Sequence, residues 1–126
     1  MNASLERLQL DYVDIVFAHA FDPVTPIEEV CRGFNHLIEE GKAFYWATSK
    51  WSAENVYEAF AVCDRLGLHR PIADQIQYNM LVRKEFEVEF ETLFDKHKYG
   101  ATVWSPLAGG FLTGKYLDGE FPEGSR

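Results

Sequence analysis

The sequence repeats a short apolar run followed by an amphipathic stretch, and this repeat constrains the fold more than any other feature. The apolar runs, which are rich in β-branched and aromatic residues, lie at 12–18, 43–48, 72–76 and 100–104. Successive runs are about 30 residues apart, which matches one strand and one helix of a parallel sheet. We therefore expect an α/β fold in which parallel strands alternate with helices.

The helical stretches between these runs have residues suited to their ends. Thr25 is expected to cap the first helix, with Glu28 completing a capping box. The second helix is expected to begin after Ser52, which can cap it, and to end at Gly67. A third helix is expected over 86–94, where phenylalanine recurs at helical spacing.

Two architectures use this repeat, an open doubly wound sheet and a closed barrel of eight strands. A sheet of four apolar parallel strands would leave unpaired edges, whereas a barrel removes them by closing. We therefore expect a parallel (β/α)8 fold of the TIM-barrel type, of which residues 1–126 carry about four strands and their helices. An open four-stranded domain covered by helices is the alternative.

Composition and charge narrow the possible functions. The chain is 47% hydrophobic with a net charge of -8, which indicates a packed core and argues against nucleic acid as a partner. No run of apolar residues is long enough for membrane insertion, and the N-terminal residues lack a secretory signal, so we expect a cytoplasmic protein. Cys31 and Cys63 lie on apolar helical stripes without neighbouring metal ligands. They are expected to be buried thiols rather than a metal site.

Each predicted strand ends in polar or aromatic residues that an ordinary loop does not require. These residues are His19, Ser49 with Lys50, Gln75, and Trp104. Because the carboxyl ends of parallel barrel strands face one mouth, we expect these side chains to lie near one another.

Taken singly, each of these residues has an ordinary interpretation as well as a functional one. His19 can hydrogen-bond nearby backbone, or it can donate to a substrate carbonyl. Gln75 can satisfy its own loop, or pair with a ligand that carries an amide. Trp104 can belong to the core, or stack on a planar heterocycle. The residues alone leave both interpretations open.

Five stretches in register resemble the aldo-keto reductases, and within them the beta subunits of voltage-gated potassium channels. The stretches are 8–14, 19–23, 48–52, 74–79 and 104–110 continuing to 114–116. The resemblance covers nearly the whole chain, so 1–126 is interpreted as one partial barrel domain. It implies an oxidoreductase that binds NADP(H) and reduces aldehydes or ketones by hydride transfer.

The resemblance also implies roles for individual residues. His19 takes the position of the catalytic histidine that orients the substrate carbonyl. Ser49, Lys50 and Gln75 match residues that contact the nicotinamide carboxamide, and Trp104 matches the aromatic residue that stacks on the nicotinamide ring. The remaining cofactor contacts, along the pyrophosphate and beyond, are matched by Ser105, Pro106, Leu107, Ala108, Gly109, Lys115 and Arg126.

The chain departs from the family pattern at several positions. Channel beta subunits commonly carry Asn at the position of His19, which favours an enzyme. At Lys50 the reductases usually have Asn and the channel subunits Arg, and Ala20-Phe21 replaces a more usual Arg-Pro. The stretches 50–52 and 104–108 nevertheless favour the channel branch.

The proton-donating Tyr of the family, with its Lys and Asp, comes from strands that precede the matched region. None of the six tyrosines of this chain matches that position. We therefore expect the 126-residue polypeptide alone to be inactive and to bind cofactor weakly or not at all. NADPH oxidation with a reactive aldehyde measures this, and clear turnover would contradict it.

Three functions follow from these observations. The leading hypothesis is an NADPH-dependent reductase of a small carbonyl substrate. The alternative is an auxiliary subunit that docks on a potassium channel alpha subunit and senses redox state through its cofactor. The third is a degenerate fragment without enzymatic activity. Either of the first two functions is compatible with a homo-oligomer.

Overall fold

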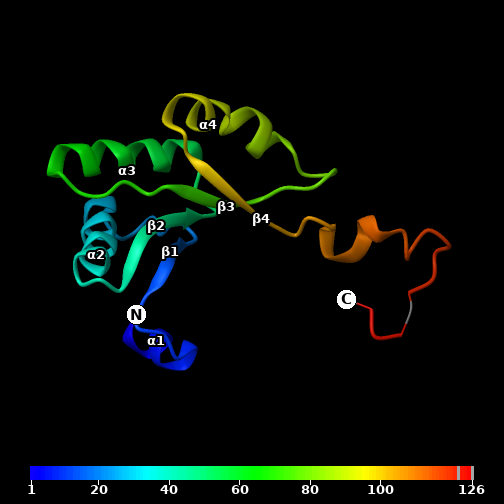
Figure 1. Ribbon diagram of the computed structural model, residues 1–126. Helices are drawn as coiled ribbons and strands as arrows, with labels where there is room; N and C mark the ends of the chain where they lie inside the picture. Colours follow the sequence, from blue (N-terminus) through cyan, green and yellow to red (C-terminus); the bar gives the residue numbers. More distant parts are fainter. Residues whose placement is uncertain (122, 126) are drawn as a thin grey trace.

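The computed structural model describes residues 1–121 and 123–125, and it is built around a four-stranded sheet (Figure 1). The strands lie side by side in chain order, and every neighbouring pair is parallel. They are β1 (Val13–His19), β2 (Ala43–Ser49), β3 (Ala73–Gln77) and β4 (Gly100–Trp104). The predicted parallel α/β fold and its strand period are confirmed.

Three helices connect the strands: α2 (Ile27–Glu39), α3 (Ala53–Leu66) and α4 (Glu91–His97). A short helix, α1 (Asn2–Leu8), precedes β1 and lies apart from these three in Figure 1. Helix α2 packs on both β2 and α3. Beyond β4 the chain leaves the sheet and extends away from it, through a 3-10 segment at Ala108–Thr113. Within the described residues, no helix combines the length and apolar character needed to cross a bilayer.

The ends of α3 form as predicted. Ser52 Oγ accepts a hydrogen bond from the backbone N–H of Asn55 at 3.2 Å. Gly67 follows the last turn with a φ of 67°, a left-handed conformation that glycine adopts without a Cβ clash.

The predicted capping box of α2 is wrong. Thr25 Oγ1 donates to Asp22 Oδ2 at 2.7 Å instead of capping, and the helix begins at Ile27 without a side-chain cap. The carboxylate of Asp22 also accepts from the backbone N–H of Val24 at 2.9 Å. These hydrogen bonds lower the pKa of Asp22. The hydroxyl of Thr25 therefore donates to a charged acceptor three residues earlier, and it does not cap the helix.

The single helix predicted over 86–94 is also wrong, because a π-helical turn at Glu85–Glu89 precedes α4. A π turn contains one more residue than an α turn, so it changes the face that the following side chains occupy. Phe90, at the junction, is fully buried, and Phe86 stacks on Tyr78 with ring centroids 4.3 Å apart.

The core lies between the sheet and helices α2 and α3. Trp46 of β2 is 0% exposed, stacks on Phe34 at 5.2 Å, and donates its Nε1–H to the carbonyl of His69 at 2.7 Å. Cys31 and Cys63 are both buried and free, as predicted.

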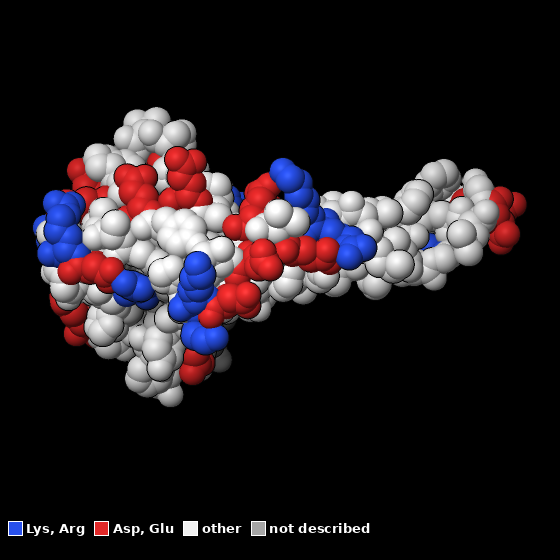
Figure 2. Space-filling view, turned by 90° about the horizontal axis from the view of Figure 1, so that it is seen from above, with Lys and Arg blue, Asp and Glu red and all other residues white. Residues whose placement is uncertain are grey.

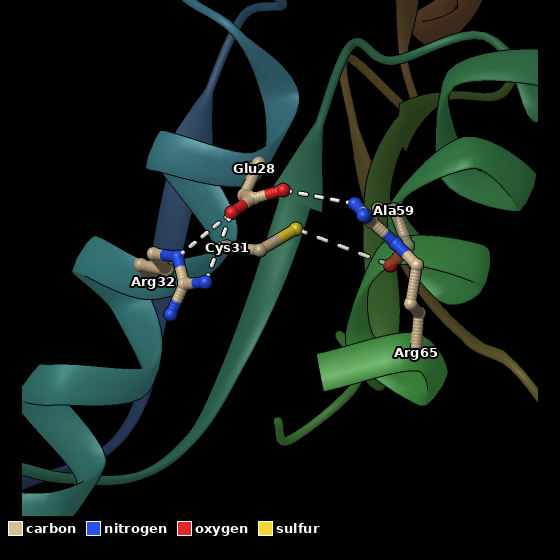
Figure 3. A network of polar contacts seen from close by, with 5 residues as sticks. All are labelled: Glu28, Cys31, Arg32, Ala59 and Arg65. Atoms are coloured by element: carbon tan, nitrogen blue, oxygen red, sulfur yellow. Dashed lines mark hydrogen bonds and ion pairs between the residues drawn. The ribbon is translucent and has the colours of Figure 1, made fainter. Parts of the chain in front are cut away.

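A polar network links α2 to α3 at the rim of this core (Figure 3). Glu28 on α2 accepts from Arg32 on the same helix and from Arg65 on α3, at 2.9 and 2.8 Å. The Arg32 hydrogen bond, followed by that of Arg65, lowers the pKa of Glu28. Beneath this bridge the thiol of Cys31 points to the carbonyl of Ala59.

Candidate functional site

The register of the sheet brings three predicted site residues into one row. His19 pairs with Ser49, Ser49 pairs with Gln75, and Gln75 pairs with Thr102. Paired residues of a parallel sheet point to the same face, and successive residues point to opposite faces. Because Trp46 faces the helices, Ser49 and its row face away from them. The row lies at the carboxyl ends of β1 and β2 but at the middle of β3 and β4, so the prediction that Gln75 ends its strand is wrong.

Trp104 lies on the same face, two residues beyond Thr102 at the end of β4. It pairs with Gln77, and its side chain is half-buried. Among the described residues, its indole Nε1 is buried without a hydrogen-bond partner. The ammonium Nζ of Lys50 lies 4.9 Å from the centroid of its ring. Trp104 therefore offers a partly accessible aromatic surface at the mouth.

The residues that follow three of the strands have left-handed backbone conformations. Ala20 after β1, Lys50 after β2 and Ser105 after β4 have φ values of 53°, 59° and 54°. This conformation costs a residue with a Cβ roughly 1 kcal/mol or more. Sequence reasoning missed the conformation of these residues, because none of them is the Gly, Asn or Asp that usually marks it. Such strain is typical of ligand sites.

Hydrogen bonds hold these turns in place. The backbone N–H of Ala20 donates to the carbonyl of Ser49 at 2.8 Å, and that of Lys50 donates to the carbonyl of Gln75 at 3.3 Å. Ser49 Oγ donates to the carbonyl of Gln75 at 3.1 Å. The hydroxyl oxygen of Ser49 therefore keeps its lone pairs as an acceptor in a fixed position.

Asn79 fixes the turn after β4. Its Nδ2 donates to the carbonyl of Ser105 at 3.0 Å, while its Oδ1 accepts from the backbone N–H groups of Leu81 and Val82. Asn79 is buried, and it joins the loop after β3 to the end of β4. The strained Ser105 is therefore held by a side chain from the neighbouring connection.

A buried polar network lies behind the row, on the helix side of the sheet. Thr48 Oγ1 donates to Asp74 Oδ1 at 2.5 Å and is 2.7 Å from the phenolic oxygen of Tyr99. Burial raises the pKa of Asp74, and hydrogen bonding from Thr48 and from the backbone of Trp51 and Lys50 opposes that rise. Burial also raises the pKa of Tyr99. Sequence reasoning missed this network, although a carboxylate inside an apolar strand was its signal.

We predict that Asp74→Asn becomes more stable relative to the wild type as the pH rises from about 3 to 7. Because the folded-state pKa of Asp74 is raised, its contribution to stability is present below the unfolded pKa of about 3.9 and is lost as the pH rises through the folded pKa. Asn keeps an acceptor for Thr48 and cannot ionise. Urea unfolding of both proteins at several pH values measures the difference. A difference that does not vary with pH would contradict the prediction.

The predicted phosphate-facing residues gather in the segment after β4. Ser105, Pro106, Leu107, Gly109 and Lys115 line one hollow of about 400 Å³, together with Gly110. Ala108 lies in the same segment with a φ of 48°. Arg126 lies outside the described residues.

The segment after β4 differs in surface character from the rest of the chain. Charged side chains gather over the helices and sheet in Figure 2, whereas the projecting segment is mainly uncharged. Its exposed large side chains are Leu107, Phe111, Leu117 and Phe121. In the described part of the chain, no three His, Cys, Asp or Glu side chains gather where a metal ion could bind.

Comparison with known proteins gives consistent matches across the chain. The model of the aldo/keto reductase family matches residues 1–125. A protein of Schizosaccharomyces pombe named as a voltage-gated potassium channel subunit beta is 55% identical over 100% of this chain and 36% of its own length. Proteins with the same name from Arabidopsis thaliana and Oryza sativa subsp. japonica are 52% and 48% identical, over 98% and 100% of this chain and 38% of their lengths. The chain thus spans a little over a third of these relatives.

Proposed function

The chain belongs to the aldo/keto reductase family, and from that membership we propose that it supplies the nicotinamide-facing side of an NADP(H)-dependent carbonyl reductase. The family has a (β/α)8 barrel fold, and the four parallel strands are part of such a barrel. We propose that residues 1–126 form one part of this barrel domain in a cytoplasmic protein.

The row of His19, Ser49 and Gln75 is the observation that carries this proposal. The hydroxyl of Ser49 and the amide of Gln75 offer an acceptor and donors at one end of the row, which suit a carboxamide. His19, exposed at the other end, is suited to donate to the oxygen of a carbonyl substrate and hold its carbon toward the nicotinamide. The cofactor, when bound, supplies the hydride.

The remaining residues fit the other parts of the same cofactor. The half-buried ring of Trp104 provides a surface for stacking. Lys115 brings a positive charge to the hollow that the segment after β4 forms, which suits phosphate oxygens.

We predict that Trp104→Ala weakens NADPH binding by about tenfold, equivalent to ~1.4 kcal/mol of lost stacking. Trp104→Phe keeps an aromatic surface and is expected to lose less. Fluorescence titration of NADPH into the full-length protein and both variants measures the dissociation constants. Equal affinities for wild type and Trp104→Ala would show that this ring does not contact the cofactor.

A second function is supported by the names of the relatives, which are potassium channel beta subunits at 48–55% identity. In this proposal the full-length protein docks, as a homo-oligomer, on the alpha subunit of a voltage-gated potassium channel. Co-expression with such an alpha subunit and size-exclusion chromatography test it. Co-elution in one complex supports the channel role, and separate elution contradicts it.

A further inference from the structure

A cation lies against the aromatic ring on which the nicotinamide is proposed to stack. The ammonium of Lys50 is 4.9 Å from the centroid of the Trp104 ring. Lys50 follows β2 whereas Trp104 ends β4, so the contact crosses the end of β3. The chain thus places one full positive charge beside the candidate stacking surface.

The backbone holds the base of this side chain in place. Lys50 has a φ of 59°, and its N–H donates to the carbonyl of Gln75 at 3.3 Å. Its neighbours Ser49 and Trp51 are both buried, and Trp51 packs edge-on against Phe21 at 5.1 Å. The exposed side chain of Lys50 extends from this fixed base, so its charge stays near the mouth of the site.

Nothing in the described part of the chain neutralises this charge. The ion pairs of that part join other lysines and arginines to carboxylates, and none includes Lys50. Asp74 faces the helix side of the sheet, where its carboxyl accepts hydrogen bonds from Thr48 and from the backbone of Trp51 and Lys50, and it forms no ion pair with the Lys50 ammonium. Among the described residues, the ammonium is therefore a charge without an ion-pair partner at the mouth of the site.

An uncompensated ammonium distinguishes the two redox states of a nicotinamide. The oxidised ring carries a positive charge and the reduced ring carries none. A ring on the far face of the indole would lie roughly 8 Å from the ammonium, where Coulomb repulsion corresponds to about threefold to tenfold in affinity. If the nicotinamide ring stacked instead on the indole face where the ammonium lies, the ammonium would move aside, but by no more than the length of the Lys50 side chain. Repulsion therefore acts on the oxidised form in either arrangement.

We infer that Lys50 sets the redox-state selectivity of the site, disfavouring the oxidised, positively charged nicotinamide relative to the reduced, neutral one. This inference rests on the proposed function, because it requires that a nicotinamide stacks on Trp104. It also gives Lys50 a role in turnover, since the oxidised product leaves more readily than the reduced cofactor.

Dissociation constants for NADPH and NADP⁺ test the inference in the full-length protein. In Lys50→Gln, the ratio of the NADP⁺ constant to the NADPH constant is expected to fall about threefold to tenfold, mainly through tighter NADP⁺ binding. Lys50→Met, a second neutral variant, is expected to give the same ratio. Lys50→Arg keeps the charge and is expected to keep the wild-type ratio.

Lys42→Gln is the matched control, because Lys42 precedes the same strand and pairs with Glu40 at 2.8 Å. Lys42 lies roughly 26 Å from Lys50 along β2, which is beyond the Debye length at ordinary salt. The ratio of the NADP⁺ and NADPH dissociation constants of Lys42→Gln is therefore expected to stay at the wild-type value.

Two further outcomes separate the inference from the proposed function. If both neutral variants weaken NADPH and NADP⁺ by the same factor, Lys50 only supports the turn, and the inference is wrong while cofactor binding stands. If the wild-type protein binds neither form, the proposed function fails and the inference fails with it. An unchanged ratio with unchanged affinities would also overturn the inference.

Discussion

Replacing His19 with Ala is expected to lower kcat/KM for an aldehyde by about 10²–10³ in the full-length protein, with little change in the dissociation constant of NADPH. His19 ends β1 at the exposed end of the row, so its loss removes a donor to the carbonyl oxygen without opening the core. The donor is needed most when negative charge develops on that oxygen, so the loss falls on the chemical step.

Steady-state NADPH consumption measures this effect, and two variants control it. His19→Gln keeps an amide donor and is expected to lose less activity. His36→Ala removes an exposed histidine from α2 and is expected to match the wild type. A loss of similar size in the His36 variant, or no loss in His19→Ala, would assign the carbonyl contact to another group.

Replacing Trp46 with Ala is expected to reduce the free energy of unfolding by about 3–5 kcal/mol, the usual range for a large buried aromatic residue. The variant loses the stacking on Phe34, the hydrogen bond to the carbonyl of His69, and the packing of a side chain that is 0% exposed. Since domains are stable by only about 5–15 kcal/mol, this loss is a large part of the total.

Urea unfolding followed by circular dichroism measures the change in stability. Trp46→Phe keeps an aromatic ring and is expected to lose less. Tyr45→Ala provides a comparison from the opposite face of the same strand, where Tyr45 is 53% exposed. A small effect at Trp46 would mean that the packing between β2 and α2 contributes little to the fold.

Much of the fold was predictable because its signals are local. Apolar runs and their spacing predicted the strands within a few residues, and Ser52 and Gly67 predicted the ends of α3. The failures arose from competition between neighbours. Asp22 took the hydroxyl of Thr25 that a sequence pattern assigned to a helix cap.

The third helix shows a different limit. Phenylalanines recur at helical spacing through 86–94, which predicts one continuous helix. A π turn ends at Glu89 instead, and Phe90 is fully buried. Spacing along one segment cannot predict such a break, because it depends on how the segment packs against the core.

The candidate site divides in the same way. By itself the sequence determined that His19, Ser49 and Trp104 lie at strand ends, because each directly ends or follows a local apolar run. Gln75 was placed at a strand end as well, but it lies in the middle of β3. Only the tertiary structure decided that three of them share one row and that Lys50 crosses β3 to reach Trp104. Register depends on hydrogen bonds between strands that are far apart along the chain, and a shift of one residue would turn every side chain to the other face.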